Sequence, residues 1–68
     1  MDKDIVLKNN VKEVRSSLKL SQEDLAKMVG TTRQTIIAIE NGVFSPTAKL
    51  ALLICLALNK KFEDLFYF

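Results

Sequence analysis

Few side chains in this 68-residue sequence have the types and spacing that chemistry requires. The chain has no histidine and one cysteine, which excludes a Ser–His or Cys–His nucleophile and a closely spaced four-ligand zinc site. The side chains with the most useful geometry are the adjacent Arg33 and Gln34. A guanidinium matches the edge of guanine, and a carboxamide matches the edge of adenine, in the major groove of DNA. We therefore expect a binding surface rather than an enzyme, with no metal and no cofactor.

Helical spacing groups further residues around this pair. On a helix over residues 32–41, Ile36, Ile39 and Glu40 share the inner arc. The outward arc holds Gln34, Ile37, Ala38 and Asn41, with Arg33 and Thr35 on its flanks. Ile37 and Ala38 suit a thymine methyl group, and the short polar groups of Thr32, Thr35 and Asn41 suit phosphate oxygens. Taken singly, these side chains are equally those of an ordinary solvent-facing helix, and it is the outward Ile37 beside Ala38 that favours a contact surface. Unpaired N–H groups at helix starts near Gln22 and Ser45 also favour an anion.

Caps and glycines predict the helices that position these residues. The first helix should run from about 10 to 18, after an asparagine cap at Asn9 or Asn10. A second should open at Ser21, with Asp24 completing a capping box and Leu25, Ala26, Met28 and Val29 facing inward, and should end at Gly30. The third follows at once from a Thr32 cap, which is the pattern of a helix-turn-helix. A fourth should run from Pro46, capped by Ser45, to Leu58, and a short fifth from Phe62 to Leu65.

One ion pair should lie inside this bundle. Arg15 falls on the inner arc of the first helix, and Glu40 falls on the inner arc of the third. Because an unpaired buried charge is very costly, we expect the two to pair and to have a structural role.

The fourth helix and the C-terminal tail carry more apolar residues than one small core needs. A helix that is apolar nearly all round must be covered on both sides. One interpretation pairs the apolar tail, residues 65–68, with Ile5–Leu7 as a small antiparallel ribbon. The other is a two-fold dimer interface made of Leu53, Leu56, Phe62, Phe66 and Phe68. We expect both together, because a chain this short is only marginally stable alone.

Length and composition limit the number of domains, the net charge and the cellular compartment. Sixty-eight residues predict a single domain spanning 1–68, and ten basic against eight acidic residues give a net charge of +2. A lone cysteine suits a reducing cytoplasm. The longest apolar run, residues 50–58, is too short to span a bilayer.

These motifs together resemble the Cro/CI-type (lambda-repressor-like) helix-turn-helix family of regulators. The resemblance rests on LSQEDLA at 20–26, VGTTRQTI at 29–36, IENG at 39–42 and Ser45–Pro46. It implies an all-α, compact five-helix domain that binds a palindromic operator in double-stranded DNA as a homodimer, most simply as a repressor. It implies base contacts by Arg33, Gln34, Ile37 and Ala38, and backbone contacts by Gln22, Thr32, Asn41 and the loop 43–45. Arg15 and Glu40 match the family's internal ion pair.

Two departures from that family pattern bear on specificity. Positions 37 and 38, often polar in relatives, are apolar here, so DNA shape should contribute more to selection. Residues 21–42 carry two basic and three acidic side chains, a net charge of −1, so lysines elsewhere must attract phosphate: Lys8, Lys12, Lys19 and Lys49. The alternative function is a protein-interaction module of the same fold, such as an antitoxin or an adaptor.

Overall fold

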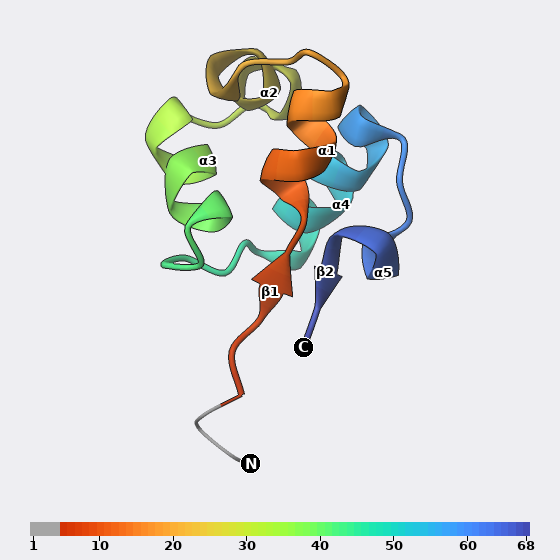
Figure 1. Cartoon of the computed structure of the whole chain (residues 1–68). Coiled ribbons are helices and arrows are strands. Elements are labelled where there is room, and N and C mark those ends of the chain that lie inside the picture. Colours follow the sequence, from red (N-terminus) through yellow and green to blue (C-terminus); the bar gives the residue numbers. More distant parts are fainter. Residues whose placement is uncertain (1–4) are drawn as a thin grey trace.

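The computed structural model describes residues 5–68 as five helices and a two-stranded ribbon (Figure 1). The elements are β1 (Lys8–Asn9), α1 (Val11–Ser17), α2 (Gln22–Val29), α3 (Arg33–Glu40), α4 (Ala48–Leu58), α5 (Phe62–Leu65) and β2 (Phe66–Tyr67). The five-helix architecture with a ribbon from the two chain ends is confirmed. Among the described residues, none of the helices is long and apolar enough to cross a membrane.

The helix-turn-helix forms where its capping residues predict it. The Ser21 hydroxyl accepts the Asp24 backbone N–H and the Asp24 carboxylate accepts the Ser21 backbone N–H, both at 2.9 Å. Gly30 ends α2 in the left-handed region, with φ of 74°, which glycine adopts without steric cost. Thr32 then caps α3 by accepting the Thr35 backbone N–H at 3.2 Å. Three local interactions therefore fix where the second helix begins, where it ends and where the third begins.

The start of α4 differs from the prediction. Its cap is Thr47, whose hydroxyl accepts the Leu50 backbone N–H at 3.2 Å, and the helix begins at Ala48 rather than at Pro46. The backbone N–H groups of Val43 and Phe44 both donate to the Ala38 carbonyl, which draws the chain after α3 into a turn. Pro46 consequently lies in the loop, and its fixed φ suits that position as well as the first helical turn.

One core of buried apolar side chains joins the five helices. Its members are Val11, Leu25, Ala26, Val29, Ile36, Ile39, Ala51, Ile54, Cys55, Leu58, Leu65 and Phe66. Met28, expected to face inward, is 53% exposed. At 100° per residue Met28 lies beyond the edge of the arc that Leu25, Ala26 and Val29 bury, so its side chain extends over the surface of α2.

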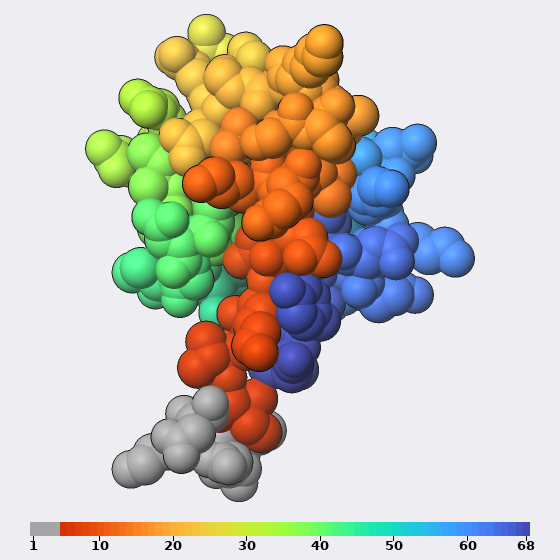
Figure 2. All heavy atoms as spheres, viewed as in Figure 1, coloured from red at the N-terminus to blue at the C-terminus, as the bar shows by residue number. Residues whose placement is uncertain are grey.

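The ribbon forms two to three residues nearer α1 than predicted. Lys8 pairs with Tyr67 and Asn9 pairs with Phe66, so Ile5–Leu7 precede the strand instead of forming it. The Asn10 backbone N–H donates to the Leu65 carbonyl at 2.8 Å, which joins the start of α1 to the end of α5. That bond sets the register. In the space-filling view the first described residues, from residue 5 onward, lie beside the C-terminal residues at the lower end of the molecule (Figure 2).

Candidate nucleic-acid interface

The outward face of α3 holds the residues with base-recognising side chains. Arg33 and Gln34, in its first turn, are exposed, whereas Ile37 and Ala38 are half-buried. The polar end of this face is therefore free to reach a ligand, and its apolar middle is recessed. The Thr35 hydroxyl lies 3.0 Å from the Thr32 hydroxyl, so the first turn already contains a small hydrogen-bonded unit.

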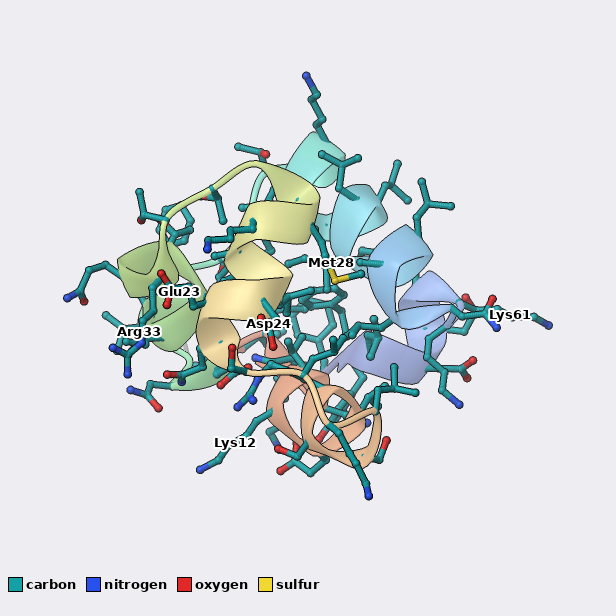
Figure 3. The ribbon with its side chains drawn as sticks, turned by 90° about the horizontal axis from the view of Figure 1, so that it is seen from above. Lys12, Glu23, Asp24, Met28, Arg33 and Lys61 are labelled. Carbon is teal, nitrogen blue, oxygen red and sulfur yellow. The ribbon has the colours of Figure 1, made fainter. Side chains whose placement is uncertain are left out.

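A hollow of about 300 Å³ opens between the starts of α2 and α3. It is lined by Arg15, Ser21, Gln22, Glu23 and Arg33. Glu23 and Arg33 lie on the same side of the molecule, with Lys61 on the opposite side (Figure 3). The sequence argument did not single out Glu23, although its place one residue after Gln22 puts it in the first turn of α2, where the helix dipole stabilises a carboxylate.

A charged network behind this face fixes the end of α3. The Arg15 Nε donates to Glu40 Oε2 at 2.7 Å, and its NH2 donates to Oε1 at 3.2 Å. Its NH1 donates to the Leu20 carbonyl at 2.7 Å. The Glu40 side chain is only 1% exposed, so the expected pair is present and is well shielded from water. Such two-point contact fixes orientation, and losing either partner would leave a buried charge uncompensated.

Gln22, predicted to contact phosphate, joins the same network. Its Nε2 donates to Glu40 Oε1 at 3.1 Å. A carboxamide has two N–H donors and a carbonyl oxygen, so the side chain anchors α2 to α3 and retains a donor for a phosphate. The phosphate contact itself stays a prediction.

The loop after α3 carries the remaining polar residues of the predicted interface. Asn41 and Ser45 are both exposed. The turn that holds them is closed by the bonds from Val43 and Phe44 to the Ala38 carbonyl, at 2.9 and 3.2 Å. These two side chains are therefore displayed by a defined turn next to the end of α3.

Asn9 also contacts the end of α3, and sequence reasoning gave it only a capping role. Its Oδ1 accepts the Val11 backbone N–H at 3.1 Å, and its Nδ2 donates to the Ile39 carbonyl at 2.9 Å. The N-cap position of α1 is Asn10, whose side chain makes no capping hydrogen bond, so the expected asparagine cap is absent and Asn9, one residue earlier, bonds the first N–H of the helix instead. The contact with Ile39 was not predictable, because it joins residues 30 positions apart.

Two of the acidic side chains near this face already have partners within the protein. Backbone and side-chain hydrogen bonds from Ser21, with help from the Lys27 charge, hold the pKa of Asp24 below its ordinary value. Glu40 is bound by Arg15. The lysines expected to attract phosphate, Lys8, Lys12, Lys19 and Lys49, are all exposed, and Lys12 lies on the same side as Arg33 in Figure 3.

The residues predicted for the dimer interface divide between surface and core. Leu56 is 78% exposed and Phe68 is 74% exposed, Phe62 is also exposed, and Leu53 is half-buried. Phe66 is 3% exposed, so it belongs to the core and is not available to a partner. The alternation of β2 turns its ring inward, where it packs on Phe62 with ring centroids 5.2 Å apart.

Two other residues of α4, Leu52 and Cys55, lie near the predicted interface residues of that helix. Leu52 is exposed and lies one turn before Leu56, a spacing that could have identified it as part of the same stripe. Cys55 is buried, and burial raises the pKa of its thiol above the ordinary value. The neutral thiol therefore acts as a small apolar side chain.

The chain is similar to known regulators over most of its length. The family profile described as helix-turn-helix matches residues 11–65. An uncharacterized HTH-type transcriptional regulator of Bacillus subtilis, YgzD, is 51% identical over 61 residues, covering 90% of this chain and 92% of the relative. A second, MJ0272 of Methanocaldococcus jannaschii, is 48% identical over 62 residues, covering 91% and 94%.

Solved structures agree with the fold. The restriction-modification controller protein C.AhdI from Aeromonas hydrophila superposes with a TM-score of 0.74 at 28% identity, covering 79% of this chain and 78% of its own. A protein from Bacteroides fragilis, provisionally described as a DNA-binding protein, superposes with a TM-score of 0.82 at 19% identity. The match covers 91% of this chain and 100% of that protein's chain. The match across the capped α2–α3 unit and the surrounding helices places this chain in the Cro/CI-type helix-turn-helix family of transcriptional regulators, which is not a family of enzymes.

Proposed function

We propose that this DNA-binding regulator is a repressor that binds a palindromic operator as a homodimer, with α3 in the major groove. The observation that carries the proposal is the outward first turn of α3. Arg33 and Gln34 are exposed there, while the end of the same helix is held by the shielded Arg15–Glu40 pair. Base recognition needs such a combination, since free polar ends must be delivered by a helix that does not move.

In this proposal the base contacts come from one side of α3. Arg33 donates to a guanine edge, Gln34 donates to N7 and accepts from the N6 amino group of adenine, and the half-buried Ile37 and Ala38 contact thymine methyl groups. With two hydrogen-bonding side chains and two apolar ones, part of the selection comes from the shape of the duplex.

The proposed backbone contacts surround that row. Gln22, Thr32 and Thr35 lie at the starts of α2 and α3, and Asn41 and Ser45 lie in the loop after α3. Helix starts and short polar side chains suit phosphate oxygens. The negative charge of Glu23 beside Arg33 should keep the salt dependence of binding modest for each monomer.

Homodimerisation is supported by the apolar surface formed by Leu53, Leu56, Phe62 and Phe68. Together with Leu52 it leaves several large apolar side chains exposed on a 7.7-kDa chain. A two-fold interface places identical patches against each other. Two α3 helices would then lie about 34 Å apart, one turn of DNA, and meet two half-sites. An operator that overlaps a promoter would be blocked by such a dimer.

The same apolar surface supports the second candidate function, a protein-interaction module such as an antitoxin or an adaptor. Exposed apolar clusters mark contacts with other chains as readily as contacts with a second copy. In that case α3 would contribute little, and another protein would cover α4 and α5.

A double substitution separates the two functions. Arg33→Ala with Gln34→Ala removes two base-recognising side chains from each subunit, each worth about 1–3 kcal/mol of discrimination, so the affinity of the dimer for its operator should fall by about 1000-fold or more. Lys61→Ala is the charge-matched control, because it also removes one positive charge but lies opposite Arg33 (Figure 3). Anisotropy titrations and sedimentation should show lost binding with an unchanged fold and mass. Unaltered specific binding by the double variant would contradict base recognition by Arg33 and Gln34, and a wild-type protein without specific DNA binding would favour the interaction module.

A further inference from the structure

The ribbon is tied to the end of the recognition helix by one side chain. The Ile39 carbonyl accepts two hydrogen bonds, one from the Gly42 backbone N–H at 3.0 Å and one from Asn9 Nδ2 at 2.9 Å. Carbonyls in the last turn of a helix lack intrahelical partners, and a carbonyl oxygen has two lone pairs. Within residues 5–68, Asn9 is the one ribbon residue whose side chain is hydrogen-bonded to α3.

The other side of the ribbon leads to the proposed dimer surface. Asn9 pairs with Phe66 across the ribbon, and Phe66 packs on Phe62. Phe68 follows β2 directly and is largely exposed. A short path of backbone pairing and ring contact therefore connects the end of α3 with two residues of the surface through which a second copy would bind.

We infer that Asn9 is a positioning residue that sets the angle of the recognition helix relative to the two-fold axis, and so selects the spacing between half-sites. The inference rests on the proposed homodimer. The α1 contact through Arg15 and Glu40 holds α3 to the body of its own subunit. The Asn9 contact holds α3 to the ribbon, whose second strand joins Phe62 and Phe68 of the proposed interface. Removing it leaves each half-site contact intact and lets the two helices vary in separation.

The chain offers a matched pair of substitutions. Asn9→Asp retains the oxygen that accepts the Val11 N–H and removes the donor to Ile39. Asn10→Asp makes the same charge change at the next residue. The Asn10 amide donates to the Asp64 carbonyl at 3.1 Å and its Oδ1 lies 3.3 Å from the Tyr67 hydroxyl, so it contacts α5 and β2 but not α3.

The first measurement uses duplexes that carry the half-site selected by the wild-type protein. One duplex holds a single half-site, one holds two at the selected spacing, and others insert or delete one base pair between them. For Asn9→Asp we expect single half-site affinity within about twofold of wild type, and a fall of about threefold to tenfold in the preference for the selected spacing. Asn10→Asp should keep the wild-type preference.

The second measurement needs no DNA. Exchange of the Gly42 amide hydrogen, which shares the Ile39 carbonyl with Asn9, should quicken in Asn9→Asp and not in Asn10→Asp. An equal loss of affinity on every duplex, or an unchanged spacing preference in Asn9→Asp, would overturn the inference. A wild-type protein that binds DNA with no spacing preference would overturn the proposed dimeric operator binding as well, and the single half-site duplex would show whether specific recognition survives.

Discussion

The two exposed surfaces of this small protein are built in opposite ways. The face made by the first turn of α3 and the start of α2 is polar, and a hydrogen-bonded network of buried charge lies behind it. The surface of α4, α5 and the chain end is apolar, with Leu56 and Phe68 mostly exposed over an apolar core. The polar face is suited to directional hydrogen bonds, and the apolar surface is suited to contacts that depend on buried area. Base recognition is directional, whereas burial of apolar surface is not.

The largest expected effect comes from the network behind the polar face. Glu40→Ala leaves Arg15 buried without its partner, and we expect a loss of about 3–5 kcal/mol in the free energy of unfolding. Chemical denaturation followed by circular dichroism measures it. Glu63→Ala, on an exposed acid of α5, should change stability by no more than about 0.5 kcal/mol. If the two variants proved equally stable, the network would not be what holds this face.

A substitution on the apolar surface should change the mass of the protein in solution rather than its stability. Leu56→Glu places a charge on the most exposed leucine of the proposed interface, and sedimentation should then report one chain in place of two. Operator affinity should fall about 100-fold or more as a consequence, because only one half-site is held at a time. Met28→Glu makes the same change on an exposed apolar residue of α2 and should remain dimeric. Wild-type protein that sediments as a single chain at micromolar concentration would contradict this use of the surface.

A smaller effect on stability is expected from the cap at the start of α2. Ser21→Ala removes the hydroxyl that caps α2, and helix caps of this kind are worth about 1 kcal/mol. Thermal unfolding should show a lower midpoint, and adding back the hydroxyl as Ser21→Thr should restore most of it. A midpoint unchanged in Ser21→Ala would mean that the turn before α2 is held by packing alone.

The smallest expected effect is a pH dependence from the other half of the capping box. Ser21 lowers the pKa of Asp24 in the folded state, so the charged carboxylate favours folding. This contribution is complete above the pKa of the unfolded chain and is lost as pH falls through the lower, folded pKa. The stability difference between wild type and Asp24→Asn should therefore be present at neutral pH and shrink in acid. A difference that grew as pH fell would contradict the assigned direction.

The fold was largely predictable because its signals are local. The box at Ser21 and Asp24, the left-handed Gly30 and the Thr32 cap each involve residues a few positions apart. The predicted start of α4 was wrong because Thr47 and Ser45 are chemically similar caps. Which of the two caps the helix depends on the turn that follows α3. Phe66 was assigned to the wrong surface because composition indicates an apolar tail but not which ring turns inward.

The candidate site was predictable in part for the same reason. Helical spacing identified the outward row on α3, and the cost of an unpaired buried charge identified Arg15 with Glu40. The hydrogen bond from Asn9 to Ile39 and the hollow shared by Glu23 and Arg33 depend on how distant segments pack. No local pattern encodes such contacts.

The central claim is that the first turn of α3 enters a DNA duplex and distinguishes its bases. Selection of bound sequences from a pool of random duplexes tests it most directly, with wild-type protein and the Arg33→Ala, Gln34→Ala double variant run in parallel. We expect the wild-type protein to enrich a motif of two inverted half-sites about one helical turn apart, and the double variant to lose the enriched bases. A wild-type pool without an enriched sequence, or the same motif from both proteins, would contradict it.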